Sequence, residues 1–325
     1  MHHFPRDNDS RATLKDERPV MTIRWYPGHM DKALEQMAET VRRIDVIIEV
    51  LDARLPSSSS NHLLEGIRRT KPCIKVLNKN DLADPAITKA WVRHFEAQAG
   101  VKALPLSARQ LADAKKLIKL CQRLVPHRGK PGWPLRVMVF GIPNVGKSTL
   151  INTLAGRSLA RVGDKPAITT CAQQIDLKNG IILSDTPGVL WPEMDDQVAA
   201  KRLAASGAIG SGAFDVVTVA LFAAEYMMQR YPQTIRERYK LAELPDNPTT
   251  LLDAVGRRLG CLISGGTVDH NRAAEAFLRE LRSGKLGRIS FEEPCVSATQ
   301  ADEDASPPQL PSAGVPAVDE GEKLL

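Results

Sequence analysis

Between residues 44 and 186, short apolar runs rich in β-branched residues alternate with longer amphipathic stretches. This alternation is typical of a parallel sheet whose faces are covered by helices. The expected strands are Val46–Leu51, Cys73–Leu77, Val101–Leu106, Leu135–Phe140, Gln174–Leu177 and Ile181–Ser184. The expected helices are Ala33–Arg43, His62–Arg69, Ala86–Gln98, Leu111–Leu124 and Ser148–Ala155. The pattern therefore predicts a doubly wound, mostly parallel α/β domain.

After residue 188 the apolar positions follow only a helical period. The expected helices there are Asp195–Ser206, Asp215–Arg230, Thr249–Arg258 and Asn271–Arg282, and the last one places Ala273, Ala276, Phe277 and Leu281 on one face. From Cys295 onward the chain is rich in Pro, Ala, Ser and acid, a composition that favours disorder. We thus expect four regions: a disordered extension over 1–20, the α/β domain over 21–206, a small all-α domain over 207–292 and a disordered acidic Pro-rich tail over 293–325.

Composition indicates a globular protein that acts in the cytoplasm and does not enter a membrane. The 325 residues are 43% hydrophobic and 25% charged. Apolar runs such as 216–224 are shorter than the roughly 20 residues of a spanning helix. The N-terminal region carries Asp7 and Asp9 and has no apolar core segment, which argues against a secretory signal. Five cysteines form no C-x-x-C pair and seven histidines show no ligand spacing, so we expect buried free thiols and no zinc site.

The charge is distributed unevenly along the chain. The net charge is +6, and the residues from 292 onward contain eight acidic residues and one basic residue, so residues 1–291 carry +13. A surplus of this size favours a polyanionic partner, because Lys and Arg that neutralise phosphates release condensed counterions. A basic protein without such a partner remains an alternative from charge alone.

One strong motif is the segment Gly141–Ser148, with the sequence GIPNVGKS. It fits the phosphate-loop pattern and stands between an expected strand and an expected helix, which is the required context. Lys147 would reach the β- and γ-phosphates of a nucleotide, and the Ser148 hydroxyl would bind Mg²⁺. The loop residues expected around the phosphates are Asn144, Val145, Gly146, Lys147, Ser148 and Thr149.

A second motif, Asn78-Lys79-Asn80-Asp81, indicates which base is bound. It follows an expected strand, at the edge where α/β sheets place ligands. The Asp81 carboxylate can accept two hydrogen bonds from guanine N1 and N2, a donor pair that adenine lacks. Asn78 would support the base and the Lys79 stem would lie along its ring. Taken alone, the tetrapeptide is also compatible with a surface turn.

Three weaker signals fall at other strand ends or in the intervening loop. Ser107 and Ala108 stand where a backbone amide could meet the guanine O6. Asp185 could hold a Mg²⁺-bound water, and Gly188 could sense the γ-phosphate. Thr169 is favoured over its neighbour to complete the Mg²⁺ shell, although each segment alone is also compatible with an ordinary turn or loop. Together these elements predict one GTP- and GDP-binding site.

The motifs appear in a different order from that of most GTPases, which place the phosphate loop first. Here the base-reading motif comes ahead of the phosphate loop. Because the termini of a closed domain often lie close together, a sheet tolerates such a permutation. The resulting order places the expected γ-phosphate sensor directly before the helical region, so the nucleotide state could pass into it.

With these residues in view, the chain resembles the YlqF-type ribosome biogenesis GTPase A family of circularly permuted P-loop GTPases. The resemblance covers about residues 21–292. The passages that carry it are Trp25–Met30 (WYPGHM), Leu51–Pro56 (LDARLP), Asp185–Pro192 (DTPGVLWP) and Arg282–Gly287 (RSGKLG).

The resemblance implies a GTP-hydrolysing switch that docks on the maturing large ribosomal subunit, contacts its ribosomal RNA and is released on hydrolysis. It implies that His29 helps to orient the attacking water, because Val189 follows Gly188 where Ras-like enzymes carry glutamine. It also implies that Asn144 binds K⁺ beside the phosphates. The basic residues that would contact RNA are Arg230, Arg236, Arg238, Arg257, Arg258, Arg279, Arg282 and Lys285. No DNA partner is expected.

Two other functions remain open from the sequence. The protein could be a GTPase switch that acts on another RNA or protein partner, or an RNA-binding protein that functions without nucleotide. Pro166-Ala167 stands where relatives usually have Pro-Gly, so the chain departs from the family pattern just before Thr169. His29 is equally compatible with a structural role in its loop.

Overall fold

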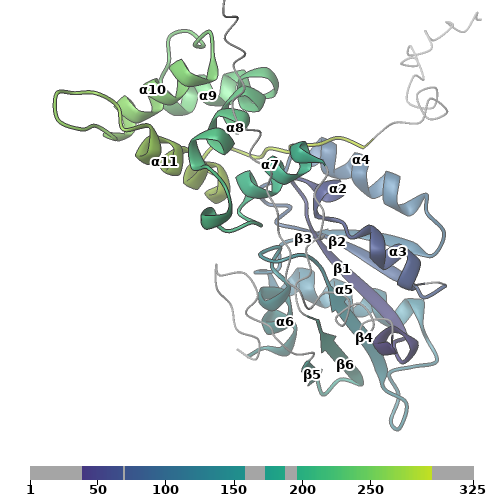
Figure 1. The fold of residues 1–325 in the computed structure, drawn as a ribbon. Helices are drawn as coiled ribbons and strands as arrows, with labels where there is room; N and C mark the ends of the chain where they lie inside the picture. The colour runs from purple at the N-terminus through teal and green to yellow at the C-terminus, as the bar shows by residue number, and fades with distance from the viewer. Residues whose placement is uncertain (1–38, 69, 158–172, 187–195, 295–325) are drawn as a thin grey trace, which may run out of the picture. The chain divides into compact units, whose positions relative to one another are not determined.

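A computed structural model of the chain describes residues 39–68, 70–157, 173–186 and 196–294 (Figure 1). The chain divides into a compact unit, Met1–Glu293, and a second unit, Pro294–Leu325. The predicted extension over 1–20 and nearly all of the predicted tail lie outside the described residues. Of the expected helix Ala33–Arg43, only its last part is described, and residues 39–42 are helical there.

The described strands form one mixed sheet in the order β3-β2-β1-β4-β6-β5. All neighbouring strands are parallel except β5, which is antiparallel to β6. The bounds are β1 Val46–Asp52, β2 Cys73–Asn78, β3 Val101–Leu106, β4 Leu135–Phe140, β5 Gln173–Asp176 and β6 Ile181–Asp185. This confirms the predicted fold class, a doubly wound and mostly parallel sheet.

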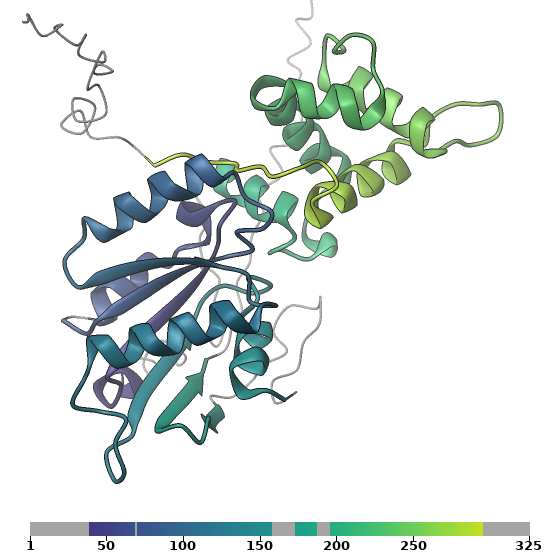
Figure 2. The same cartoon turned by 180° about the vertical axis from the view of Figure 1, so that it is seen from behind.

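Both faces of the sheet are apolar, as burial of a parallel sheet between helices requires. Along β1, Val46, Ile48 and Val50 belong to one buried cluster, whereas Ile47 and Leu51 belong to the other. The first face is covered by α5, Leu111–Leu124, and α6, Lys147–Ala155; the second by α3, His62–Arg68, and α4, Pro85–Glu96 (Figures 1 and 2). The chain leaves β1 toward β2 and leaves β4 toward β6, so the strand order reverses between β1 and β4, where open α/β sheets place their ligands.

The region after the sheet is helical, in agreement with the periodicity. Its α-helices are α7 Gln197–Ser206, α8 Val216–Arg230, α9 Pro232–Tyr239, α10 Pro248–Leu259 and α11 His270–Ser283, with a short 3₁₀ turn at Ser211–Ala213. Side chains of Asp196, Asp215, Asn247 and Asp269 accept backbone N–H groups at helix starts, which satisfies donors that a helix leaves unpaired. The predicted face of α11 is buried, with Ala276 partly so.

Two described helices were not predicted. The helix α2, Pro56–Ser59, has four residues and no apolar period, and it begins at a proline whose φ suits a first helical position. The helix α9 also begins at a proline, but its eight residues are mostly polar and only Ile235 and Tyr239 are buried. Periodicity is too weak a signal in segments this short or this polar.

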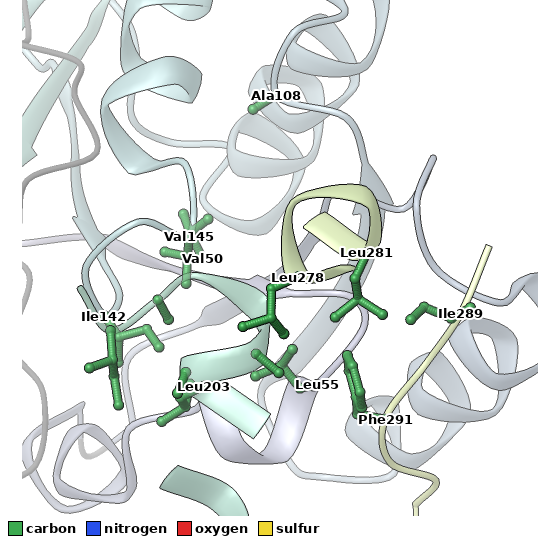
Figure 3. Packing of buried hydrophobic residues seen from close by; sticks show 14 of the residues in the cluster. Val50, Leu55, Ala108, Ile142, Val145, Leu203, Leu278, Leu281, Ile289 and Phe291 are labelled. Carbon is green, nitrogen blue, oxygen red and sulfur yellow. The ribbon is translucent and has the colours of Figure 1, made fainter. Parts of the chain in front are cut away.

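One apolar cluster extends from the sheet into the helical region. It contains Ile142 and Val145 near β4 together with Leu203 of α7 and Leu278 of α11 (Figure 3). The three cysteines of the described part, Cys73, Cys121 and Cys261, are buried, as expected. Among the described helices, none combines the length and the apolar content needed to cross a membrane.

Candidate nucleotide-binding site

The predicted motifs meet at the carboxyl edge of the sheet. Asn78 ends β2 beside Leu106, the last residue of β3, and Asp185 ends β6 beside Val139 of β4. The phosphate loop follows β4 directly and leads into α6. Four separate parts of the chain are therefore brought to one edge, and in the sequence the base-reading motif still comes before the phosphate loop.

Two glycines of the phosphate loop are required by close approaches. Gly141 has φ 153°, and a Cβ built on it would lie 2.5 Å from the Val50 carbonyl oxygen of β1. Gly146 has φ 100°, and its Cβ would lie 2.3 Å from Asn78 Nδ2. Since neither position can take a side chain in this arrangement, the loop is fitted tightly to β1 and to the base-reading motif.

Lys147 is buried at the start of α6. Its Nζ donates to the carbonyl oxygens of Gly141, at 3.0 Å, and Ile142, at 3.2 Å. Burial lowers the pKa of Lys147 to about 8, although the nearby Asp185 carboxylate acts in the opposite direction. The ammonium therefore lies within the loop that would surround the phosphates, in surroundings that an added negative charge would stabilise.

The Asn78 side chain joins three of the motifs. Its Nδ2 donates to the Val145 carbonyl at 2.6 Å, and its Oδ1 accepts from the Ala108 amide at 2.8 Å. The Thr153 hydroxyl of α6 donates to the Ala108 carbonyl at 2.7 Å. These contacts hold the phosphate loop, the base-reading turn (residues 78–83) and the segment after β3 against one another.

Lys79 adds a second connection between the same two loops. It has φ 60°, and its Nζ donates to the Asn144 carbonyl at 3.1 Å and to Asp52 Oδ2 at 2.9 Å. Asp52 also accepts two hydrogen bonds from the Arg54 guanidinium, at 2.9 and 2.7 Å. Although burial acts the other way, the charges of Arg54 and Lys79 hold the pKa of Asp52 well below its usual range.

The Asp52–Arg54 pair was not assigned a role from the sequence. Both side chains are almost completely buried, and Arg54 also donates to the Ser206 carbonyl at the end of α7, at 3.3 Å. A signal was present, because Asp52 stands at the end of a central strand, the place where the other motifs were recognised. The pair links Lys79 to the helical region.

The remaining base-reading residues differ in exposure. Asp81 is exposed, so its carboxylate is open to a ligand, whereas Ser107 and Ala108 are buried. The Ser107 amide donates to Asp113 Oδ2 at 3.2 Å, and the Ala108 amide donates to Asn78. Both N–H groups therefore have acceptors within the protein.

Asp185 and Ser148 provide oxygen atoms suited to Mg²⁺. In the described part of the chain, the buried Asp185 Oδ1 has no hydrogen-bond partner. Burial raises the pKa of Asp185, and the charge of Lys147 lowers it in part. A carboxylate and a hydroxyl are ligands that Mg²⁺ accepts together with water and phosphate oxygens. The unpaired oxygen is therefore consistent with a place for a cation, and the residues fit the ion.

Asn144 connects the phosphate loop to the helical region. It has φ 58°, and its Nδ2 donates to the Gly207 carbonyl at 3.2 Å. The amide nitrogen is thus committed, and the side-chain oxygen is the atom that a K⁺ ion would use. His29, Thr169 and Gly188, the other predicted catalytic residues, lie outside the described residues. Thr149 is half-buried in the first turn of α6.

A phosphate loop after a central strand, joined to an Asn-Lys-x-Asp turn on the same sheet edge, defines a P-loop GTPase. A family described as "50S ribosome-binding GTPase" matches residues 136–221. Ribosome biogenesis GTPase A of Bacillus cereus is 43% identical over 281 residues, which cover 84% of this chain and 95% of that protein. The same-named protein of Thermotoga maritima is 31% identical over 280 residues, 83% and 94% of the two chains.

Solved structures agree with these relatives. A structure described as GDP-bound TM YlqF has a TM-score of 0.61 and 28% identity, and the match covers 80% of this chain and 99% of that one. The GNP-bound YlqF from T. maritima gives 0.58 and 27%, with 81% and 98% covered. The chain belongs to the ribosome biogenesis GTPase A, or YlqF-type, family, and it is a GTP-hydrolysing enzyme.

Proposed function

We propose that this GTPase reads guanine with Asp81 and holds the phosphates with the loop Asn144–Thr149, with Lys147 as its cation. The observation that carries the proposal is the pair of hydrogen bonds made by Asn78, to Val145 and from Ala108, since they join the motifs into one site. The Lys147 ammonium and the loop amides would stabilise the charge that develops on the transferred phosphoryl oxygens.

Two cations belong to the same proposal. Ser148 and Asp185 would hold Mg²⁺, with Thr169 completing the shell, and the ion would supply charge neutralisation on the phosphates. The Asn144 side-chain oxygen would bind K⁺, in place of the charge that an arginine finger gives to other GTPases. His29 would orient the attacking water and the Gly188 amide would sense the γ-phosphate.

The partner that we propose is the maturing large ribosomal subunit, in the cytoplasm, with ribosomal RNA as the surface contacted. The support is the family description, which says that its members bind the 50S ribosome, and the basic charge of residues 1–291. Of the eight predicted RNA-contacting residues, all but Arg238 and Arg282 are exposed. In contrast, Arg282 donates to the carbonyls of Ala204 and Ala205, and so serves the fold.

Three further basic residues have acidic partners within the protein. Arg238 and Lys285 pair with Glu280, and Arg230 pairs with Glu293. Contacts of this kind reduce the charge that a side chain offers to a phosphate. Arg236 donates to the Ala242 carbonyl, so we limit the proposed RNA-contacting group to Arg257, Arg258 and Arg279.

The test is sedimentation with large subunits in a non-hydrolysable GTP analogue. Wild type should co-sediment, and the combined change of Arg257, Arg258 and Arg279 to Ala should weaken binding with a smaller salt dependence, because fewer counterions are released. The matched control changes three exposed basic residues of α5, Lys115, Lys119 and Arg123, to Ala and should bind as wild type. Absence of wild type from the large-subunit fractions would favour another partner.

The rate of GTP hydrolysis is the second measurement that tests the proposal. GTP turnover should be slow for the protein alone, faster with large subunits and faster in potassium than in sodium buffer. Equal turnover in the two buffers would remove K⁺ from the proposal. Subunit binding that stays unchanged in Lys147→Ala, a variant that should lose GTP turnover, would instead support RNA binding that needs no nucleotide.

A further inference from the structure

The segment after α11, Leu286–Glu293, returns to the base-reading turn; we name it the return segment (Figures 1 and 2). Arg288 donates from Nη2 to the Asn80 carbonyl and from Nε to the Ala83 carbonyl, both at 2.9 Å. The Ile289 amide donates to the Leu82 carbonyl at 3.0 Å. Three backbone carbonyls on the two sides of Asp81 are therefore held by residues about 200 positions later in the chain.

The return segment is itself firmly anchored. Ile289, Ser290 and Phe291 are at most 1% exposed, and the two apolar ones belong to the cluster shared by the sheet and α11 (Figure 3). The Phe291 amide donates to the Arg54 carbonyl at 2.7 Å. The Ser290 hydroxyl accepts from the Asp84 amide at 3.2 Å, one residue beyond the turn. Because the segment is fixed at several points, it can impose a position on the turn.

The Asp81 side chain is exposed, so its orientation depends on the backbone that carries it. The Arg guanidinium has N–H donors in a rigid planar fork, and a fork that grips two carbonyls of one turn fixes their separation. The backbone that carries the Asp81 carboxylate is thus held by an arginine from another region of the chain.

We propose that Arg288 is a positioning residue for guanine selectivity, which acts through the Asn80 and Ala83 carbonyls to aim the Asp81 carboxylate at the base. This inference rests on the proposed role of Asp81 and adds a residue that lies outside all of the nucleotide motifs. Arg288 does not touch the nucleotide in this proposal. Removal of its side chain should affect discrimination between bases, whereas binding of the phosphates by the phosphate loop should not change.

The experiment measures Kd for GDP and for inosine diphosphate, which lacks the 2-amino group that Asp81 would accept from. Arg288→Ala should weaken GDP binding by about tenfold, within the usual range for coupling between sites, and should bring the two Kd values closer together. Inosine diphosphate should be affected less, because it makes one fewer hydrogen bond to the carboxylate. Ser290→Ala should act in the same direction with a smaller effect.

Arg236→Ala is the matched control. Arg236 is also exposed in the helical region and also donates to a backbone carbonyl, that of Ala242 at 2.9 Å, but the acceptor lies far from the turn in sequence. It should leave both Kd values unchanged. An Arg288→Ala protein that keeps the wild-type ratio of the two Kd values, or an Arg236→Ala protein that shifts it equally, would overturn the inference.

Asp81→Asn separates failure of this inference from failure of the proposed site. An amide both donates and accepts, so preference should move from GDP toward xanthosine diphosphate. If that preference moves while Arg288→Ala keeps the wild-type ratio, only the positioning role is wrong. If GDP affinity is unchanged in Asp81→Asn, the assignment of the base-reading turn is itself wrong.

Discussion

The phosphate loop and the base-reading turn lie at one edge of the same sheet, but they are held in different ways. The phosphate loop follows β4 directly, and its Gly141 fits against the Val50 carbonyl of the neighbouring strand β1. Lys147 donates to carbonyls of its own loop. The base-reading turn is held by residues from much later in the chain, above all by Arg288 and Ile289.

This difference separates a local structure from one that depends on long-range contacts. The phosphate loop takes its shape from the strand and helix that flank it, and contacts from Asn78, Lys79 and Gly207 add to this local structure. The turn around Asp81 is complete only when the region that follows the sheet has folded against it. Since contacts between distant residues form after loop-closure entropy has been overcome, the base end should be the later to form and the easier to disturb.

The largest expected effect comes from Arg54→Ala, at the base end. The change leaves the Asp52 carboxylate buried with Lys79 as its remaining cationic partner in the described part of the chain. Removing one partner of a buried ion pair typically costs about 3–5 kcal/mol, because the other charge stays desolvated. Denaturant unfolding should show this loss, and Arg123→Ala, an exposed arginine of α5, should not change stability. A loss below about 1 kcal/mol would mean that Lys79 alone is sufficient.

The second prediction concerns Lys147 of the phosphate loop and the pH dependence of GDP binding. The pKa of Lys147 is lowered to about 8 because burial disfavours the ammonium, and a bound phosphate would raise it again. Above pH 8 the free protein loses a proton that the complex retains, so the affinity for GDP should fall by up to about tenfold per pH unit. GDP titrations between pH 7 and 9 measure this slope.

Stability without nucleotide should change in the opposite direction. Between the folded pKa of about 8 and the usual lysine pKa, near 10.4, the unfolded chain binds more protons than the folded one, so the free energy of unfolding rises with pH. Lys147→Arg serves as the control, because a guanidinium stays charged throughout, so the free energy of unfolding should rise less steeply with pH than in wild type. A wild-type profile no steeper than that of Lys147→Arg would contradict the assignment of Lys147.

Most of the sheet and the phosphate loop could be predicted from the sequence. The strands Val101–Leu106 and Leu135–Phe140 have the bounds that the apolar runs predicted. In each case the signal is local, since a strand, a glycine turn and a helix start are encoded within about ten residues. The same holds for the Asn78 turn, a tetrapeptide that begins at the last residue of a strand.

What could not be predicted is encoded by contacts between distant residues. Arg288 has no motif around it that indicates a role at the base-reading turn, and the Asp52–Arg54 pair is visible in the sequence but its acceptor, the Ser206 carbonyl, is not. The predicted use of Arg282 in RNA contact overlooked that two carbonyls of α7 take its guanidinium. A basic residue on a helix looks the same in the sequence whether its partner is solvent, RNA or a helix end.

The smallest effect should come from Thr153→Val, which tests how much the segment after β3 depends on its contact with α6. The Thr153 hydroxyl of α6 donates to the Ala108 carbonyl, and valine keeps the shape while removing the donor. We expect a stability loss of about 1 kcal/mol. Thr88→Val is the control, because the Thr88 hydroxyl makes a similar bond, to the Asp84 carbonyl within α4. Both variants should lose similar stability in denaturant.

Only Thr153→Val should weaken GDP binding, and by no more than about threefold, since a net hydrogen bond contributes little and Asn78 still joins Val145 to Ala108. If Thr153→Val weakened GDP binding as strongly as Arg288→Ala, the segment after β3 would depend on α6 as much as the base-reading turn depends on the return segment. The contrast between a locally held phosphate end and a base end held from a distance would then be wrong.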